Sequence, residues 1–291
     1  MIIITGATGE LGRRVVEHLT DRVPASKIGV SVRDPEKASD LQGLGIRVRQ
    51  GDYEDAERLR HAFEGAQQVL LISSPARRTG GDPLLQHRTA IESAQWVGAE
   101  RIVYTSHMAA SDTSAFPPML DHAQTEQMLK GSGIAWTALR NGFYSSSGLE
   151  LMGDAFTKGF YSGALDGKFS WTAHDDLAEI AAIILAGETK FDGPTPALTG
   201  SQALNLADLC AIASEQQEQR VVRKIIPDEQ FRTSLTSKGM PPGAVEMIVG
   251  LFIAARNGEF AKIDPTLENL LGRKPITMKE LIAKHLKSRN S

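Results

Sequence analysis

His122 and Glu126 are one helical turn apart in a segment, around Met119 to Lys130, whose apolar spacing predicts a helix. A histidine titrates near neutral pH, so His122 is a candidate for holding a substrate or delivering a proton to it. Tyr104, at the end of a predicted strand, is a second candidate for catalysis. The structural alternative stays open: Glu126 pairs with Lys130 on a solvated helix face, and His122 simply lies at the helix start.

A glycine-rich segment, Gly6–Gly12 with the sequence GATGELG, lies between an apolar run and an amphipathic run. Gly6 permits the tight turn, Gly9 lets an anion approach the main chain, and Gly12 lets the helix pack closely on the strand. The first N–H groups of the helix have no partner inside it and lie at the positive end of its dipole. An ordinary glycine turn is the alternative, but the flanking strand and helix favour a dinucleotide pyrophosphate as the ligand.

Strand and helix patterns alternate through the first half of the chain. After the apolar run Met1 to Ile4, strands are predicted at Ile28 to Val32, Ile46 to Gln50, Gln68 to Ser73, Arg101 to Ser106 and Ala135 to Arg140. Helical stretches are predicted between them, near Ala56 to Phe63, Leu84 to Val97 and Met119 to Lys130. This alternation predicts an α/β fold with a doubly wound parallel sheet, a NAD(P)-binding Rossmann fold.

The later sequence is looser and predicts a smaller C-terminal substrate lobe beside the Rossmann domain. We expect residues 1–145 to form the NAD(P)-binding domain, to which the chain returns near 168–200. Residues 146–167 and 201–291 are expected to form a cap that binds the substrate.

Arg33 follows the second predicted strand, about 20 residues past the glycines, where an NAD-binding protein places an acid for the ribose 2′-hydroxyl. A guanidinium there suits a bidentate contact with a 2′-phosphate, and Lys37 offers a second cation. Asp34 and Pro35 are more simply explained as a helix N-cap followed by proline at the first helical position. The sequence therefore favours NADPH over NADH.

The other strand ends carry small polar side chains with aromatic neighbours, a suitable floor for a flat ring. Asp52 either accepts the adenine amino group or caps the helix that follows it, and both readings stay open. The predicted coenzyme contacts are Gly6, Ala7, Thr8, Gly9, Glu10, Leu11, Gly12, Arg33, Lys37, Asp52, Tyr53, Ser73, Ser74, Pro75, Thr105, Ser106, Asn141, Gly142, Phe143 and Tyr144.

The composition limits the function classes. With 291 residues and a formal net charge of −3, the chain has no basic field, and no cluster of Lys and Arg indicates nucleic acid as a partner. The single cysteine, Cys210, excludes an internal disulfide and suits a reducing compartment. No apolar run approaches the ~20 residues of a membrane span, and no targeting segment precedes the first strand. We expect a cytoplasmic protein without a membrane partner and, because metal-ligand spacings are absent, without a metal site.

A set of ordered motifs carries a family resemblance. Gly6–Gly12, Arg33, Gly51-Asp52-Tyr53, Tyr104-Thr105-Ser106 and Leu139–Tyr144 together resemble the atypical short-chain dehydrogenase/reductases of the NmrA-like group. Within that group the chain is most similar to the branch of bacterial NAD(P)H:quinone oxidoreductase 2 and triphenylmethane reductase. The resemblance covers nearly the whole chain and implies a small-molecule electron acceptor of the quinone type. A homodimer stays open as the assembly.

Most short-chain reductases protonate their product with a tyrosine placed four residues before a lysine. This chain has no such pair: Tyr53, Tyr104, Tyr144 and Tyr161 are followed at that spacing by Glu57, Met108, Gly148 and Leu165. In the equivalent helix, the resemblance implies that His122 and Glu126 replace the pair. Hydride addition to an isolated ketone makes a basic alkoxide that needs an acid, whereas a quinone yields a delocalised phenolate and a cationic dye is simply neutralised.

The sequence therefore predicts an NADPH-dependent reductase that transfers hydride directly to a quinone or a similar electron-poor conjugated acceptor, a cationic dye included. A protein of another class is the first alternative: a non-catalytic NmrA-like regulator that senses NADP. A sugar-nucleotide epimerase or reductase ranks third, because it too relies on the missing tyrosine and lysine.

Overall fold

The computed structural model describes residues 1–289, which divide into two compact units. Unit 1 comprises Met1–Ala110, Asp121–Arg140 and His174–Pro196. Unit 2 comprises Ser111–Leu120, Asn141–Ala173 and the described chain from Ala197 onward. Neither unit is one continuous stretch of sequence, and the assignment of coenzyme binding to the first and substrate binding to the second stays a prediction.

Unit 1 is built on a seven-stranded sheet with the order β10-β6-β5-β4-β1-β2-β3. Its strands are β1 (Ile2–Thr5), β2 (Ile28–Val32), β3 (Arg47–Gln50), β4 (Gln68–Leu71), β5 (Arg101–His107), β6 (Ala135–Asn141) and β10 (Gly193–Pro194). In the parallel pairs of β1, Ile2 lies opposite both Ile28 and Gln68. The chain builds β2 and β3 on one side of β1 and β4, β5 and β6 on the other, so the predicted doubly wound sheet is confirmed.

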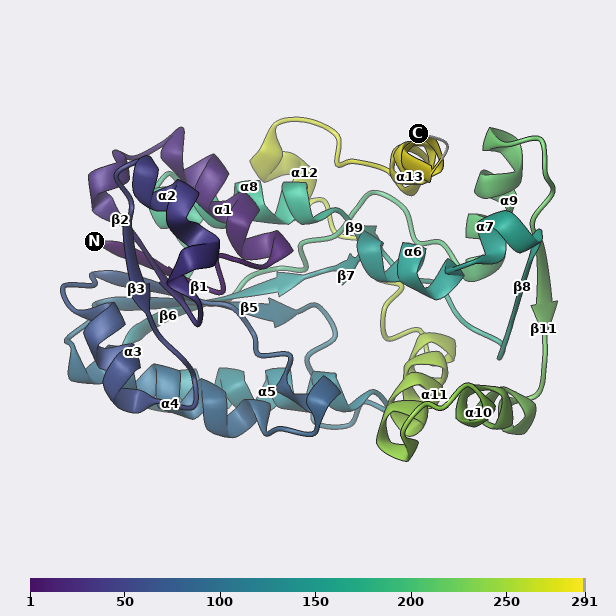
Figure 1. Cartoon of the computed structure of the whole chain (residues 1–291), viewed down its shortest axis with the longest axis horizontal. Coiled ribbons are helices and arrows are strands. Elements are labelled where there is room, and N and C mark those ends of the chain that lie inside the picture. Colours follow the sequence, from purple (N-terminus) through teal and green to yellow (C-terminus); the bar gives the residue numbers. More distant parts are fainter. Residues whose placement is uncertain (290–291) are drawn as a thin grey trace. The chain divides into compact units, whose positions relative to one another are not determined.

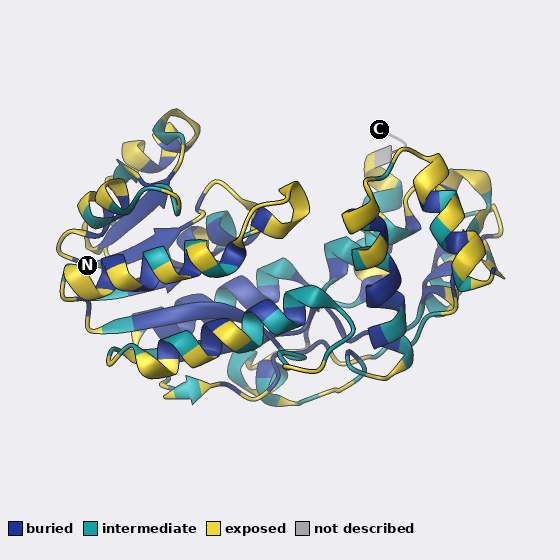
Figure 2. Cartoon of the chain, turned by 90° about the horizontal axis from the view of Figure 1, so that it is seen from below, coloured by how far each residue is buried: buried dark blue, intermediate teal, exposed yellow. Residues whose placement is uncertain are grey.

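Helices cover both faces of this sheet. They are α1 (Glu10–Thr20), α2 (Ser39–Gly43), α3 (Ala56–Phe63), α4 (Pro83–Trp96), α5 (Pro117–Gly131) and α8 (His174–Ala186). In Figure 1, α1 and α8 lie on one face of the sheet, and α3, α4 and α5 lie on the other. Figure 2 shows the inner strands mostly in the dark blue of buried residues and the helices with buried and exposed stripes, as crossover helices on a parallel sheet require.

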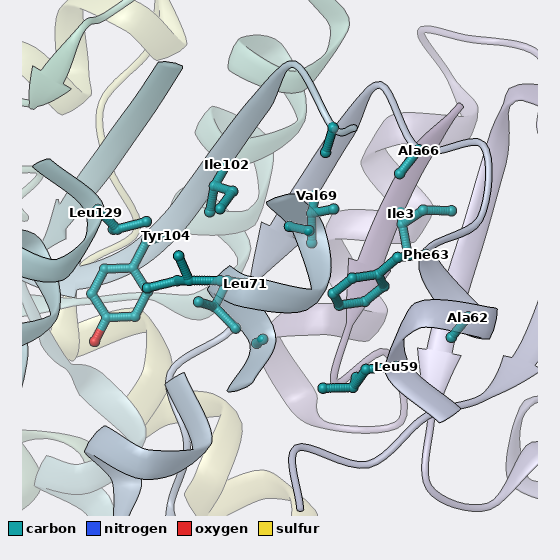
Figure 3. Packing of buried hydrophobic residues seen from close by; sticks show 14 of the residues in the cluster. Ile3, Leu59, Ala62, Phe63, Ala66, Val69, Leu71, Ile102, Tyr104 and Leu129 are labelled. Carbon is teal, nitrogen blue, oxygen red and sulfur yellow. The ribbon is translucent and has the colours of Figure 1, made fainter. Parts of the chain in front are cut away.

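The core between the sheet and helices α3 to α5 is built from apolar side chains of both layers. Phe63 of α3 is fully buried and packs in one cluster with Ile3 of β1 and Val69 of β4 (Figure 3). Tyr104 of β5 lies at one side of this cluster, and its hydroxyl points away from the apolar side chains. The buried ring packs β5 against this core, and the hydroxyl lies outside the apolar cluster, where it can form a hydrogen bond.

Unit 2 contains shorter elements. They are β7 (Phe143–Tyr144), α6 (Ser145–Met152), α7 (Ala155–Lys158), β8 (Phe160–Gly163), β9 (Trp171–Thr172), α9 (Leu206–Gln216), β11 (Val222–Ile225), α10 (Asp228–Ser237), α11 (Pro242–Arg256), α12 (Thr266–Leu271) and α13 (Met278–Arg289). Strand β7 pairs with β9, and β8 pairs with β11. Phe143 packs against Phe169 and Phe260 with ring centroids 5.1 and 5.0 Å apart, so aromatic rings form an internal cluster of this unit.

The predicted elements of the first half are confirmed, with shifts of a few residues at their ends. Strand β4 ends at Leu71, two residues before the predicted end at Ser73. The reason is local: the N–H groups of Ile72 and Ser73 bond to the side-chain hydroxyls of Thr5 and Thr105 and leave the sheet ladder. The short β10 was not predicted, because two residues, glycine and proline, carry no strand signal.

Candidate active site

The turn between β1 and α1 has the geometry that the glycine pattern predicts. Gly6 has a φ of 61°, in the left-handed region that favours glycine. The N–H of Gly9 bonds to the Gly6 carbonyl at 2.9 Å and closes the turn. A Cβ at Gly12 would lie 2.8 Å from the Gly6 carbonyl carbon, so only glycine permits this close packing. The exposed backbone at Gly9 and the first-turn N–H groups fit a pyrophosphate.

The side chains of the glycine turn fall into two groups. Ala7 and Leu11 are buried, so they offer a coenzyme only main-chain atoms, whereas Thr8 is exposed. Glu10 Oε1 lies 3.6 Å from Arg14 Nη2 on the same helix. It also lies 3.6 Å from Nδ1 of His174. These contacts draw the carboxylate along α1, which lessens its repulsion of an anion at the turn.

Arg33 follows β2 and is exposed, and within the described part of the chain its guanidinium makes no ion pair or hydrogen bond. Asp34 caps the short helix Pro35–Ala38 by accepting the N–H of Glu36, with Pro35 at the first helical position, as predicted. Lys37 lies 3.6 Å from Asp34, so its charge is partly compensated. Arg33 is therefore the stronger candidate for a phosphate.

Asp52 accepts the N–H of Glu54 at 3.1 Å, while Asp55 caps α3. The capping role suggested for Asp52 is thus taken by Asp55, and Asp52 closes only the turn before the helix. Tyr53 offers no free hydroxyl: its oxygen lies 2.6 Å from Thr5 Oγ1 and donates to the Ile72 carbonyl at 2.8 Å. Burial raises the pKa of Tyr53, so this hydroxyl stays protonated and holds the ends of β1 and β4 together.

The segment after β4 is held by side chains from two neighbouring elements. Thr105 Oγ1 accepts the N–H of Ser73 at 2.8 Å, and His87 Nε2 accepts the N–H of Ser74 at 2.8 Å. The other ring nitrogen of His87 lies 2.8 Å from Thr125 Oγ1. These two bonds to backbone N–H groups hold both predicted serines, Ser73 and Ser74, in position after the end of β4.

Pro75 leads from these serines into the short helix Ala76–Thr79. Arg77 in that helix donates to both carboxylate oxygens of Asp121, at 2.6 and 2.5 Å. Asp121 is buried at the start of the unit 1 part of α5, so the pair ties the loop after β4 to this helix.

Tyr104 and His122, the two predicted catalytic residues, are in contact. The Tyr104 hydroxyl lies 2.8 Å from His122 Nδ1, and Tyr104 is fully buried. The His107 ring stacks on His122 with 6.0 Å between centroids. His107 Nδ1 accepts the N–H of Ala109, so in the neutral ring Nε2 carries the proton. The two rings and Tyr104 form a cluster that we call the histidine cluster.

The alternative that Glu126 pairs with Lys130 on a solvated helix face is wrong. Glu126 is buried, and its two oxygens accept bonds from Arg140 Nε at 3.1 Å and Nη2 at 2.7 Å. Oε1 also accepts the Ser106 hydroxyl at 2.6 Å. A buried carboxylate needs a charge partner and hydrogen bonds, and β6 supplies through Arg140 what an exposed lysine on the same helix cannot.

Burial keeps the histidines of this region neutral. Loss of hydration lowers the pKa of His122 to about 4, although the nearby Glu126 opposes the shift. Loss of hydration also lowers the pKa of His87 to about 3, with a smaller contribution from the charge on His122. The pKa of His107 lies well below its usual range for the same two reasons. At neutral pH these rings donate and accept hydrogen bonds without carrying charge.

The remaining predicted contacts, Asn141, Gly142, Phe143 and Tyr144, belong to unit 2. Asn141 is buried, and its Oδ1 has no hydrogen-bond partner among the described atoms. The N–H of Gly142 bonds to the Leu198 carbonyl at 2.7 Å, and a Cβ there would lie 3.0 Å from that oxygen. Phe143 packs in the aromatic cluster of unit 2. An orphaned buried amide oxygen is a group that a bound amide N–H would satisfy.

His87 is the residue that sequence reasoning missed. Thr125 donates its own proton to the Asp121 carbonyl at 2.7 Å, so it accepts from His87 Nδ1–H. His87 Nε2 is then left as the acceptor for Ser74. The residue lies within the predicted helix near Leu84 to Val97, where nothing in the spacing marks it, since its two partners are distant in sequence and meet it only through packing.

Residues 1–289 contain neither a cluster of metal ligands nor a helix that could span a membrane. No group of three or more His, Cys, Asp or Glu side chains there is gathered closely enough to hold a metal ion. None of the helices in that range combines the length and apolarity needed to cross a bilayer. Cys210 is buried, and burial raises the pKa of its thiol to about 11.

Comparisons with known proteins agree with this architecture. Residues 6–163 match the model of the NAD(P)H-binding family. The chain is 38% identical to quinone oxidoreductase 2 of Escherichia coli over 97% of its own length and 98% of the relative's. The NADPH complex of the E. coli NADPH-dependent quinone oxidoreductase superposes with a TM-score of 0.91 over 99% of this chain and 100% of that one. The triphenylmethane reductase of Citrobacter sp., complexed with NADP(H), is 31% identical, with a TM-score of 0.86 over 98% and 99% of the two chains.

The chain belongs to the NAD(P)H-binding family. An NmrA-like family oxidoreductase of Aspergillus flavus is 28% identical over 96% of this chain and 93% of the relative. The protein is an NAD(P)H-dependent oxidoreductase, as the motifs predicted.

Because His87, His107 and His122 are neutral when folded, unfolding exposes them to protonation, and the free energy of unfolding should fall as the pH decreases from about 7 to 4. Each histidine contributes up to about 1.4 kcal/mol per pH unit between its ordinary pKa and its lowered one. Urea unfolding across this pH range measures the slope. The His122→Asn variant should show a shallower slope than wild type, with the exposed His61→Asn as control. Equal slopes for all three proteins would contradict the assignment of a lowered pKa and a neutral ring to His122.

Proposed function

We propose that this protein is an NADPH-dependent reductase that transfers hydride directly to a quinone or a similar electron-poor conjugated acceptor. The observation that carries the proposal is the neutral, partly buried His122 beside Tyr104, in the helix where a tyrosine and lysine acid pair is missing. Such a site has no strong acid, so it suits acceptors whose product anion is delocalised. Two similar proteins, quinone oxidoreductase 2 and triphenylmethane reductase, are named for acceptors of that class.

The coenzyme contacts that we propose in unit 1 follow from its geometry. The turn at Gly6 to Gly12 receives the pyrophosphate on main-chain N–H groups, and Arg33 receives a 2′-phosphate on its uncommitted guanidinium. Ser73, Ser74 and Thr105 line the next strand ends. NADPH, when bound, supplies the hydride.

In our proposal His122 touches the acceptor, and Tyr104 positions it. If the Tyr104 hydroxyl donates to Nδ1, then Nε2 of the neutral ring carries the proton and donates a hydrogen bond to an acceptor oxygen. The two electrons of the hydride convert a quinone to its hydroquinone monoanion, which then takes a proton from solvent. The donor stabilises the oxygen on which negative charge develops, without giving up its own proton.

The coenzyme preference should depend on Arg33. We expect wild type to bind NADPH more tightly than NADH, and Arg33→Ala to raise the dissociation constant for NADPH at least about tenfold, because a charge-assisted contact is lost. The constant for NADH should barely change. Fluorescence titration measures both, with the exposed Arg88→Ala as a matched control. Equal affinities for the two coenzymes, unaffected by Arg33→Ala, would remove the argument.

The hydride acceptor can be tested in a single turnover. When the NADPH complex is mixed with a panel of quinones and cationic triphenylmethane dyes, we expect the coenzyme absorbance to decay at rates that rise with the electron deficiency of the acceptor. Stopped-flow absorbance measures this decay. Tight NADPH binding with no oxidation by any member of the panel would favour the alternative, an NmrA-like protein that senses the coenzyme.

Removing the proposed donor should slow the reaction. We expect His122→Ala to lower kcat/KM for a quinone by about 100- to 1,000-fold, the usual effect of losing one hydrogen-bond donor to a developing negative charge. The dissociation constant for NADPH should stay near the wild-type value. Tyr104→Phe should show a smaller loss, and His61→Ala none. If His122→Ala retains wild-type kcat/KM, the histidine is only structural.

A further inference from the structure

A groove in unit 1 lies between α5 and the strands β6 and β10, and its lining reaches Arg140, the residue before the predicted coenzyme contact Asn141. Its volume is about 520 Å³, within the range of small-molecule sites. One wall contains Gln127 and Lys130 of α5, and the other contains Trp136 and Arg140 of β6 and Pro194 of β10. We call it the edge groove, because β10 and β6 form one edge of the sheet.

The edge groove has cationic groups with unused donors. Arg140 uses Nε and Nη2 on Glu126, and no described residue accepts from its Nη1. Lys130 is exposed and makes no ion pair within residues 1–289. The carboxylate of Asp192, also in the lining, is compensated by Arg101 at 2.6 Å. Since Glu126 and Asp192 are each paired, Lys130 leaves an uncompensated positive charge beside the spare donor of Arg140.

The shape of the edge groove favours a flat ligand. Trp136 and Arg140 are four residues apart on β6, so their side chains share the sheet face that α5 covers. Trp136 is partly buried against the core and offers an aromatic surface, with Pro194 as an apolar neighbour. On α5, Lys130 is one turn past Glu126. An aromatic ring against Trp136 could therefore carry an anionic group to the two cations.

The wall of the edge groove is held in place before any ligand binds. Arg101 Nη1 donates to the Trp136 carbonyl, the Thr137 hydroxyl and the Phe191 carbonyl at 3.3, 3.0 and 3.0 Å. The Arg140 N–H donates to Thr195 Oγ1 at 3.0 Å. A preformed wall reduces the ordering cost of binding.

We propose that the edge groove binds a planar aromatic carboxylate, with its ring on Trp136 and its carboxylate on Lys130 and Arg140 Nη1. Arg140 also holds Glu126, and Glu126 Oε1 accepts the Ser106 hydroxyl. A carboxylate on Arg140 Nη1 shares the positive charge of the guanidinium that holds Glu126. It therefore weakens the Arg140–Glu126 ion pair and alters the bond that orients Ser106 at the end of β5. Binding of a carboxylate in the edge groove therefore changes the rate of hydride transfer. This effect on the rate, unlike the binding itself, rests on the function proposed above.

Binding is tested without coenzyme or acceptor, by calorimetry with 2-naphthoate as the probe. We expect one site per chain, and Lys130→Ala to weaken binding at least about tenfold because a charge-assisted contact is lost. The exposed Lys27→Ala should bind like wild type. Absence of binding, or equal affinity in Lys130→Ala, would overturn the site. Inorganic phosphate binding as tightly as 2-naphthoate would overturn the aromatic ligand class.

The coupling between ligand binding in the edge groove and hydride transfer is tested on the steady-state oxidation of NADPH by a quinone. A 2-naphthoate concentration that just saturates wild type should lower kcat at least about twofold and leave KM for the quinone unchanged. In Lys130→Ala, half of the maximal effect should need at least about tenfold more 2-naphthoate, in line with the weaker binding. Lys130 contacts none of the residues proposed to touch coenzyme or acceptor, so its removal should leave the basal rate unchanged. A rise in KM alone would mean that the probe competes at the acceptor site, and unchanged kcat with calorimetric binding intact would sink the coupling. Failure of the proposed function would appear separately, as no oxidation even without 2-naphthoate.

Discussion

Polar groups buried at the carboxyl ends of parallel strands must find hydrogen-bond partners inside the protein, and this requirement organises unit 1. Thr5, the last residue of β1, bonds to the end of β4: its hydroxyl accepts the N–H of Ile72 and donates to the carbonyl of Leu70. Thr105 and His87 then capture the next two N–H groups. The same bonds that end β4 early also fix the loop where a coenzyme would pass, so stability and site geometry have one origin.

The same requirement for partners decides which buried side chains of unit 1 carry a charge. Glu126 is buried and needs a cation, which Arg140 supplies in two-point contact. The histidine cluster, in which His107 is buried and His122 partly buried, stays neutral instead. A neutral ring can donate a hydrogen bond but is a poor source of a proton at neutral pH. The environment of His122 thus limits the chemistry that we propose to acceptors whose reduced form needs little acid help. The Glu126 pair with Arg140 also places a cation at the edge groove, where its remaining donor is open to another anion.

Much of the fold was predictable because its signals are local. The apolar runs and helical spacings predicted the order of the elements, and the glycines predicted the turn at Gly6 to Gly12, since a positive φ and a close approach exclude larger side chains. Asp34 and Pro35 behaved as a cap because capping involves only neighbours in the chain. Where a prediction required choosing a partner across the fold, local rules failed: Glu126 was paired with Lys130 at helical spacing, but the structure pairs it with Arg140.

The sequence by itself determined the α/β class, the glycine turn and the position of Arg33 after β2, because each depends on backbone conformation or on neighbours a few residues apart. Only the tertiary structure decided that His87 holds Ser74, that Tyr104 meets His122, and that Arg140 joins Glu126 to the edge groove. The physical reason is desolvation: once packing removes water from a polar group, its partner is whichever group the sheet and helices bring within reach, however distant in the chain.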